Sequence, residues 1–252
     1  MWRDYDSLRS DLYRRTRSGM KLGLERMTEA LAQLKDPHRA YDVIHIAGTN
    51  GKGSVAMSIE AMLIHAGEKV GTTTSPHLHS YRERFRLDTV PVSEEFLLLC
   101  ANQIGRKLDT SLSDQLTFFE YSTLLAMWIF KEAGVTVAVM ETGLGGRLDS
   151  TNVNYRRKVS VLTNVDLDHQ AYLGNTLDAI ATEKLAIARP HEPLVLGSLE
   201  LLRYNLSHYN QDNVLCVGRE IQVCDSGDKV GFSIAAKLGP VVNLPAVRIA
   251  LP

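Results

Sequence analysis

The 252-residue sequence has few cysteines, no excess of charge of either sign and no long apolar run. Its three cysteines, Cys100, Cys216 and Cys224, form no CxxC pair, and their odd number argues against a disulfide framework. Lys and Arg total 28 against 29 Asp and Glu, so no general basic field exists to hold nucleic acid or a membrane surface. No stretch approaches the roughly 18 apolar residues of a membrane span. We therefore expect neither nucleic acid nor a membrane among its partners.

The N-terminal residues also lack the apolar core of a signal peptide, because residues 1–6 are rich in charge. Together with the sparse cysteines, this predicts a cytoplasmic protein. The composition, 44% hydrophobic and 23% charged, is typical of globular proteins. The length corresponds to one large domain or two small ones.

Short apolar runs alternate with segments of helical periodicity along the chain. Strands are predicted at 42–47, 69–74, 136–140, 159–163 and 193–196, with short β segments at 214–217 and 230–234. Helices are predicted around 22–34, at 55–66 with Gly67 as the C′ residue, from the N-cap Ser93, at 118–133, at 177–188 and from about Leu199. Residues 77–92 are predicted to form a long functional loop or a small β excursion. The alternation predicts an α/β fold with a mostly parallel sheet flanked by helices.

Unusual residues follow the predicted strands at their carboxyl ends, where open parallel sheets bind ligands. They are Gly48–Ser54, Ser75, Glu141 and the segment Asp166–His169. These four segments are therefore predicted to share one ligand site.

The first of these segments resembles a phosphate-binding loop. It consists of Gly48, Thr49, Asn50, Gly51, Lys52, Gly53 and Ser54. Backbone N–H groups, a helix N-terminus and the lysine charge would together hold phosphate oxygens. The strict G-x-x-x-x-G-K-[ST] pattern is not met, because Ile46 stands at the first glycine position and Gly53 follows Lys52. The alternative is an ordinary glycine turn, but the strand before it and the helix after it favour nucleotide binding.

Glu141 ends a hydrophobic strand, where a carboxylate is costly unless it is paired or binds a cation. Magnesium suits this position, since it prefers carboxylates together with phosphate and water. The alternative is a salt bridge to Arg147 or Lys52.

Asp166, Asp168 and His169 follow the next strand and make His169 a metal candidate. A single histidine in a loop is more often a hydrogen-bonded surface residue. Lys184 lies on the next predicted helix, and spacing alone predicts only a solvated lysine there.

Several motifs occur in a fixed order that resembles one family. They are Leu22-Gly23-Leu24-Glu25-Arg26-Met27, Gly48–Ser54, Ser75-Pro76-His77-Leu78, Phe119-Glu120-Tyr121, the segment 141–152 (ETGLGGRLDSTN), Asp168-His169 and Glu183-Lys184. Over residues 20–190 the chain thus resembles the dihydrofolate synthase/folylpolyglutamate synthase family, within the Mur-ligase-type ATP-dependent amide ligases.

The resemblance implies a P-loop NTPase-like Mur ligase central domain and a ligase of folate biosynthesis. ATP would phosphorylate the carboxylate of dihydropteroate or of a folate polyglutamate, and the amine of L-glutamate would attack the resulting acyl phosphate. The implied cofactors are ATP and Mg²⁺ at two sites, and we expect a monomer.

The resemblance also implies the role of each site residue. Lys52 would hold the β- and γ-phosphates, and Lys184 would be carbamylated. Ser75, Glu141 and His169 would bind the metal ions, with His169 and Glu141 sharing the second. Catalysis would rest on Lys52, Lys184 and His169. The pterin would contact Thr117, Phe119 and Asp149. Asn164 and Asp166 depart from the family pattern, which more usually has a Ser and a small or apolar residue at these positions.

The family implies a longer chain with a second, glutamate-ligase domain. We expect residues 1–252 to form the N-terminal ATP-binding domain, with 213–252 as a β-rich closing segment and the C-terminal domain absent. Two other readings stay open: a non-catalytic fragment that binds nucleotide or pterin, and a different P-loop phosphotransferase. The sequence does not decide between dihydropteroate and folate acceptors.

Overall fold

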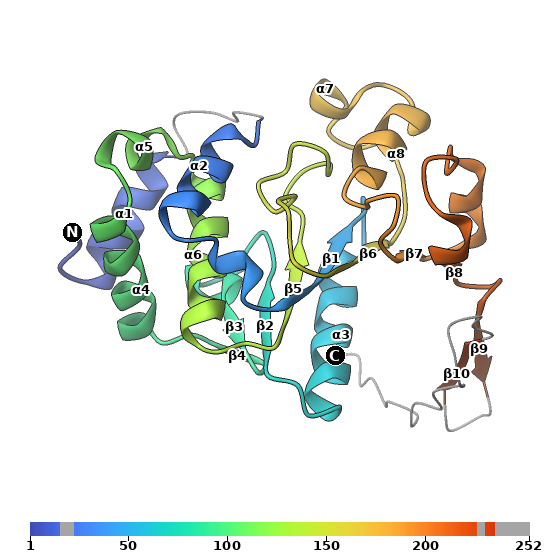
Figure 1. The fold of residues 1–252 in the computed structure, drawn as a ribbon, viewed down its shortest axis with the longest axis horizontal. Helices are drawn as coiled ribbons and strands as arrows, with labels where there is room; N and C mark the ends of the chain where they lie inside the picture. The colour runs from blue at the N-terminus through green and yellow to red at the C-terminus, as the bar shows by residue number, and fades with distance from the viewer. Residues whose placement is uncertain (16–22, 226–229, 235–252) are drawn as a thin grey trace.

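The computed structural model describes residues 1–15, 23–225 and 230–234. Its main element is an eight-stranded sheet in the order β4-β3-β2-β5-β1-β6-β7-β8 (Figure 1). The strands are β1 (Asp42–Ala47), β2 (Val70–Thr73), β3 (Arg86–Leu87), β4 (Val90–Pro91), β5 (Val137–Glu141), β6 (Lys158–Leu162), β7 (Leu194–Leu196) and β8 (Val214–Cys216). Within this sheet the β2–β3 and β3–β4 pairs are antiparallel, and the other five pairs are parallel. A separate antiparallel pair consists of β9 (Ile221–Asp225) and β10 (Val230–Ile234).

Helices cover both faces of the sheet. The α-helices are α1 (Tyr5–Arg15), α2 (Glu25–Gln33), α3 (Lys52–His65), α4 (Glu94–Lys107), α5 (Thr110–Gln115), α6 (Phe118–Glu132), α7 (Gln170–Leu173) and α8 (Leu177–Leu185). The 3-10 helices are η2 (Pro37–Arg39), η3 (Tyr81–Arg84), η4 (Leu199–Arg203) and η5 (Gln211–Asn213). In Figure 1, α1, α2, α4, α5 and α6 gather on one side of the sheet, while α3 lies on the other. The predicted α/β fold with a mostly parallel sheet flanked by helices is confirmed.

The central strands are buried on both faces because successive side chains point to opposite sides. On β5, Ala138 and Met140 pack in the large core that includes α6, whereas Val139 packs with Ile46 and α3. This alternation explains why the strands appear in the sequence as unbroken apolar runs.

Strands are added to the sheet on both sides of β1. From β1 the chain crosses through α3 to β2, and after β5 it continues on the far side of β1 with β6, β7 and β8. The loop after β1 therefore opens at a topological switch point, where parallel sheets form their ligand crevice.

Two predicted helix boundaries are confirmed. The Ser93 side chain accepts a hydrogen bond from the Phe96 N–H at 3.1 Å and caps α4. Gly67, with φ of 87°, follows the end of α3 as its C′ residue.

Other expectations are refined or corrected. Residues 77–92 form the small β excursion, since they contain η3, β3 and β4. The helix predicted from Leu199 is only the short 3-10 helix η4, because Leu199 is half exposed and Leu201 alone is buried, which leaves no continuous apolar face. Helix α8 ends at Leu185 rather than at 188. Leu22, placed in the first predicted helix, lies outside the described residues, as do 226–229 and 235–252 of the predicted closing segment.

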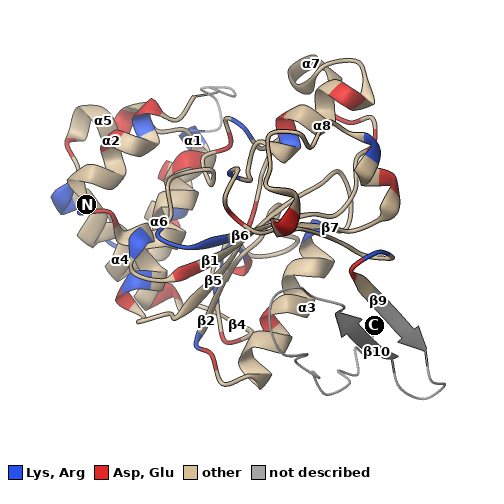
Figure 2. Cartoon of the chain, turned by 45° about the vertical axis from the view of Figure 1, so that its right-hand side comes forward, with Lys and Arg blue, Asp and Glu red and all other residues tan. Residues whose placement is uncertain are grey.

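The surface chemistry agrees with the balanced charge. Figure 2 shows Lys and Arg interspersed with Asp and Glu over the described elements. Within these residues, no helix combines the length and the apolar character needed to cross a membrane.

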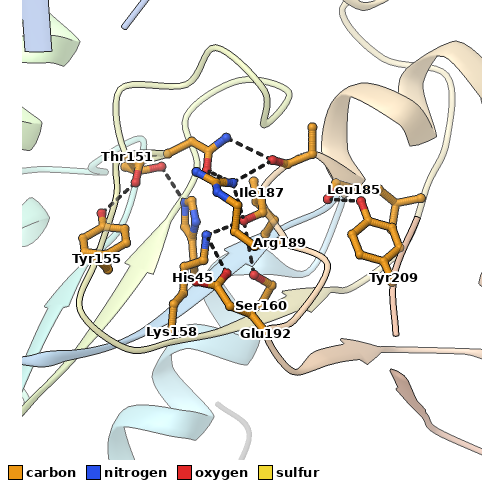
Figure 3. Close-up of polar contacts among 12 residues, drawn as sticks. His45, Thr151, Tyr155, Lys158, Ser160, Leu185, Ile187, Arg189, Glu192 and Tyr209 are labelled. Atoms are coloured by element: carbon orange, nitrogen blue, oxygen red, sulfur yellow. Dashed lines mark hydrogen bonds and ion pairs between the residues drawn. The ribbon is translucent and has the colours of Figure 1, made fainter. Parts of the chain in front are cut away.

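A buried polar network lies beneath the sheet's carboxyl edge (Figure 3). His45 of β1 is fully buried, and its Nε2 is 2.7 Å from the Thr151 hydroxyl. That hydroxyl donates in turn to the Asp149 carboxylate, so His45 Nε2 carries the hydrogen and donates it to Thr151. Burial and the nearby charges of Lys158 and Arg189 lower the pKa of His45 well below its ordinary value. His45 is therefore a neutral link between β1 and the loop after β5.

The same network secures the end of α8. The Lys158 ammonium donates to the Ile187 carbonyl and lies 3.3 Å from Glu192, and burial lowers the pKa of Lys158 to about 8. Arg189 donates to the Asn152 side chain at 3.2 Å and to the Ala186 carbonyl at 3.3 Å. Cationic side chains thus satisfy carbonyls that the helix end leaves without partners.

We predict that the buried, neutral His45 makes stability depend on pH. The unfolded chain takes up a proton near pH 6.5 that the folded chain excludes, so the free energy of unfolding falls as the pH drops below about 6.5, by up to about 1.4 kcal/mol per pH unit from this group. Urea unfolding between about pH 7.5 and 5 measures this slope.

The His45→Gln variant should show a shallower slope than the wild type below about pH 6.5. Burial also lowers the pKa of His38. His38 is present in both proteins, so it contributes equally to both slopes. The exposed His208→Gln variant is the control and should keep the wild-type slope. Equal slopes for His45→Gln and wild type would contradict the prediction.

Candidate functional site

A cavity of about 550 Å³ lies beyond the carboxyl ends of the central strands. Its walls come from segments far apart in the sequence, following β1, β2, β5 and β6 and at the start of α6. The sequence-predicted residues that line it are Lys52, Ser75, Thr117, Phe119, Asp149 and His169. The fold therefore brings together segments that the sequence singled out separately.

The first half of the glycine loop is clamped by the end of β6. Asn164 Oδ1 accepts hydrogen bonds from the N–H groups of Thr49 and Asn50, at 3.1 and 2.8 Å. The Asp166 N–H donates to the Thr49 hydroxyl at 2.9 Å. A Cβ at Gly48 would lie 1.8 Å from Thr163 Oγ1, so only glycine permits this approach. Asn164 and Asp166, which both depart from the family pattern, are thus part of the clamp.

The second half of the loop is open. The backbone N–H groups of Gly51, Lys52, Gly53 and Ser54 have no acceptor among the described residues. They form the N-terminal turn of α3, whose dipole favours an anion. This arrangement fits a phosphate chain.

Lys52 and Lys184 meet at the same carbonyl oxygen. Lys52 Nζ donates to Gly48 O at 3.1 Å, and Lys184 Nζ donates to it at 3.0 Å. Lys184 is buried, and burial together with the charge of Lys52 lowers the pKa of Lys184 to about 8. The solvated lysine that spacing alone predicted is therefore wrong for Lys184, because α8 turns it toward the glycine loop.

Glu141, at the end of β5, contacts Ser75 after β2. Glu141 Oε2 accepts the Ser75 N–H at 3.1 Å. Burial raises the pKa of Glu141, while the Ser75 hydrogen bond and the charge of Lys52 oppose that rise. Arg147 pairs instead with Glu183 at 2.9 Å, so the alternative salt bridge from Glu141 to Arg147 is wrong.

His169 lines the cavity from the loop after β6. It has φ of 47°, and its Nε2 lies 3.5 Å from Asp168 Oδ2. Among residues 1–15, 23–225 and 230–234, no three His, Cys, Asp or Glu side chains converge closely enough to hold a metal by themselves. The oxygen donors of Glu141 and Ser75 nevertheless fit Mg²⁺, which usually keeps several waters and binds substrate phosphate.

An aromatic wall, formed by Phe118 and Phe119 at the start of α6, lines part of the cavity. Thr117 caps α6 in a reciprocal arrangement with Glu120, whose carboxylate also pairs with Arg26 at 2.8 Å. This cap fixes the direction of Phe119, which lies within the first turn between Thr117 and Glu120. Its ring packs so closely on Gly143 that a Cβ there would lie 2.3 Å from Phe119 Cζ.

Asp149 lines the cavity, but its carboxylate is bonded within its own loop. Oδ2 accepts the N–H groups of Gly143 and Leu144, both at 2.8 Å, and Oδ1 accepts the Thr151 N–H at 2.9 Å. Burial raises the pKa of Asp149, and the hydrogen bonds to Thr151, Leu144 and Gly143 oppose it. Asp149 therefore shapes the loop that faces Phe119.

The sequence did not single out three further residues that line the cavity: Arg15, Arg84 and Tyr172. The alternation of Arg82, Arg84 and Arg86 is visible in the sequence, but its period does not reveal that only Arg84 reaches the cavity.

Comparison with known proteins places this site in a family. Residues 46–198 match the family model described as the Mur ligase middle domain. The dihydrofolate synthase/folylpolyglutamate synthase of Escherichia coli is 40% identical over 232 residues, which cover 92% of this chain and 54% of that protein.

Solved structures show the same fold. E. coli FolC in complex with DHPP and ADP superimposes with a TM-score of 0.81 at 34% identity, over 92% of this chain and 56% of FolC. A bifunctional folylpolyglutamate synthase/dihydrofolate synthase with Mn, AMPPNP and L-glutamate bound gives 0.77 at 29% identity, over 95% and 57% of the two chains.

The chain spans about half the length of the curated bacterial relatives that it matches. The matched segment contains the glycine loop, Glu141, His169 and Lys184. The chain therefore belongs to the Mur ligase family and, within it, to the dihydrofolate synthase/folylpolyglutamate synthase group.

Proposed function

We propose that the chain is the nucleotide- and acceptor-binding part of an ATP-dependent ligase that joins L-glutamate to a pterin carboxylic acid, either dihydropteroate or a folate. The observation that carries this proposal is the single cavity that Lys52, Ser75 and His169 share with the aromatic residue Phe119. A phosphate-binding loop beside an apolar wall suits a reaction between a nucleotide and a flat organic acid.

ATP binding rests on the open half of the glycine loop. The free N–H groups of residues 51–54 would hold phosphate oxygens, and Lys52 would exchange its carbonyl partners for the β- and γ-phosphates. The clamp from Asn164 keeps the first half of the loop in place. ADP and AMPPNP are bound by two of the structural relatives, which supports this assignment.

Divalent cations would bind between the phosphates and the protein oxygens at Ser75 and Glu141, with His169 at a second position. The Mn in one relative supports a divalent site, and Mg²⁺ suits the same oxygen donors. When bound, the cations would neutralise charge on the phosphates. The raised pKa of Glu141 shows that burial penalises its carboxylate, a penalty that a nearby cation relieves.

The acceptor would lie against the aromatic wall. Phe119 presents its ring to a flat heterocycle, while Thr117 and the loop organised by Asp149 supply polar groups beside it. DHPP bound to one structural relative supports an acceptor site in this fold.

The chemistry proceeds by two transfers. An oxygen of the acceptor carboxylate forms a bond to the γ-phosphorus of ATP, and the bond from that phosphorus to ADP breaks. The glutamate amine then attacks the acyl carbon, loses a proton and displaces phosphate, which leaves an amide. Lys52 and the N-terminal turn of α3 would stabilise the charge that develops on the transferred group.

Lys184 is proposed to carry a carbamate. Its lowered pKa of about 8 leaves a substantial neutral fraction near that pH, and only the neutral amine attacks CO₂. The ammonium first loses one proton to give the neutral amine, and a second proton is lost as the new N–C bond forms, so the cation becomes an anion with release of two protons in all. That change would remove the repulsion between Lys184 and Lys52 and add an oxygen donor beside the phosphates.

We further propose that residues 1–252 act as the N-terminal domain, with 213–252 as its closing segment, and that turnover requires a second domain. The curated bacterial relatives are about twice as long as this chain, and the cavity is open to solvent, where water would hydrolyse an acyl phosphate. We also propose a monomeric, cytoplasmic protein.

Replacing Lys52 should weaken nucleotide binding. We expect Lys52→Met to raise the Kd for ATP by about 10- to 100-fold, because a charge-assisted hydrogen bond contributes about 1.5–3 kcal/mol. Calorimetric titration measures this change. Lys131→Met on α6, whose ammonium lies over the Trp128 ring, is the control and should bind ATP like the wild type. Equal Kd values for Lys52→Met and wild type would contradict the assignment of the loop.

The ligase assignment predicts phosphate release that depends on both glutamate and a pterin acid. We expect this activity in the chain extended by the second domain of a relative, and ATP binding without ligation in the chain alone. Release of phosphate independent of glutamate would instead support another P-loop phosphotransferase. Equal, robust ligation by both forms would contradict the need for a second domain.

The carbamate predicts a ¹³C NMR signal from protein incubated with ¹³C-bicarbonate at about pH 8. Lys184→Arg should abolish the signal, because a guanidinium is protonated at that pH. Lys158→Arg is the matched control, since Lys158 is also buried with a pKa of about 8 but is paired with Glu192. A signal that persists in Lys184→Arg would contradict the proposal.

A further inference from the structure

Arg84 stands out among the cavity residues because its guanidinium has no carboxylate partner among the described residues. Its neighbours in the sequence do have partners: Arg86 pairs with Glu60 at 3.1 Å, and Arg82 lies 3.8 Å from Glu94. Arg84 is only 8% exposed, and burial lowers the pKa of its guanidinium. A buried cation without a counter-ion is costly, so its retention in a cavity wall indicates an anionic ligand.

The surroundings of Arg84 hold its guanidinium in a defined orientation. Its Nε donates to His77 Nδ1 at 2.7 Å, and its guanidinium carbon lies 5.1 Å from the centroid of the Phe118 ring. The His77 ring stacks on Tyr13, with the centroids 6.4 Å apart. The Nε edge and one face are thereby occupied, while the two terminal nitrogens have no acceptor among the described residues. Arg84 itself is one of the residues that line the cavity. These two nitrogens form the fork that matches a carboxylate.

The other cations of the cavity are already engaged. Arg15 donates to the carbonyls of Ser113 and Leu116 and pairs with Asp11 at 3.3 Å. Lys52 lies on the glycine loop, where the open N–H groups indicate phosphate. Among the arginines and lysines of the described chain that line the cavity, Arg84 is thus the one free to bind an anion other than the phosphate.

We propose that Arg84 binds the carboxylate of the acceptor, the group that is phosphorylated, and that His77 is the positioning residue that orients it. The proposal rests on the assignment of a pterin-acid acceptor to this cavity. Arg84 lies beside the aromatic residues of α6 through Phe118, and its charge also acts on Glu141. It therefore lies near both the wall assigned to the heterocycle and the carboxylate assigned to the cations, and the acid group of an acceptor that reaches from one to the other would lie within its range.

The test compares an acid with its uncharged ester. Binding of pteroic acid and of its methyl ester is titrated by pterin fluorescence with the wild type and with Arg84→Gln. We expect Arg84→Gln to bind the acid about 10- to 100-fold more weakly and the ester equally well, since only the acid offers an anion to the guanidinium. Arg82→Gln, two residues away on the same 3-10 helix but outside the cavity lining, should leave both affinities unchanged.

Two further variants separate positioning from folding. Arg84→Lys keeps the charge but loses the fork and the contact with His77, so we expect an intermediate preference for the acid. His77→Gln should reduce that preference without removing it, because Arg84 remains but loses its fixed orientation. Thermal unfolding of each variant establishes that it is folded.

The outcomes distinguish this proposal from the one on which it rests. Suppose that the wild type binds both compounds. If Arg84→Gln then weakens the binding of acid and ester equally, or changes neither affinity, the role of Arg84 is refuted and the acceptor site stands. If Arg84→Gln does not fold, the other two variants decide. A preference for the acid in Arg84→Lys and His77→Gln that equals that of the wild type refutes the role of Arg84. If the wild type binds neither compound, the pterin-acid acceptor itself is refuted, and the role of Arg84 with it.

Discussion

The backbone carbonyl of Gly48 is the point on which the site depends. Two ammonium groups, from Lys52 and Lys184, donate to this one oxygen although their residues are far apart in the chain. Like charges at such a place repel each other, and the pKa of Lys184 is lowered by its burial and, secondly, by the charge of Lys52. A phosphate chain, or loss of the charge on Lys184, relieves it. The site is therefore electrostatically prepared for anions before any ligand arrives.

The loops around the site are held by hydrogen bonds from groups that do not themselves line the cavity. Asn164 and Asp166 hold the first half of the glycine loop against the end of β6, and Thr151 joins Asp149 to the fully buried His45. Because buried polar groups are costly when unpaired, such chains of hydrogen bonds tolerate few alternative arrangements. Rigid positioning of this kind allows the loop residues 51–54 to keep their donors free for a ligand.

The sequence predicted the elements whose pattern is local. Apolar runs marked the central strands, and a glycine loop between a strand and a helix marked the switch point at β1. Helix α1 was not predicted, because only Leu8 and Leu12 are buried among many charges. Arg84 was not singled out, since the irregular stretch around it carries no periodicity that shows which arginine turns inward. The buried state of Lys184 likewise depends on a tertiary contact with Gly48. The resemblance to a family, rather than spacing, directed attention to that lysine.

The edge of the sheet formed by β4 is poorly suited to pairing with another strand. Strand β4 is only two residues long, and Pro91 lacks the N–H that a neighbouring strand would require. The exposed side chain of Val90 leaves an apolar group at this border, but the backbone there offers little for another chain to extend. Short, proline-containing borders of this kind hinder the edge-to-edge stacking that leads to aggregation. The β excursion at residues 86–91 thus shields the longer parallel strand β2 from unwanted pairing.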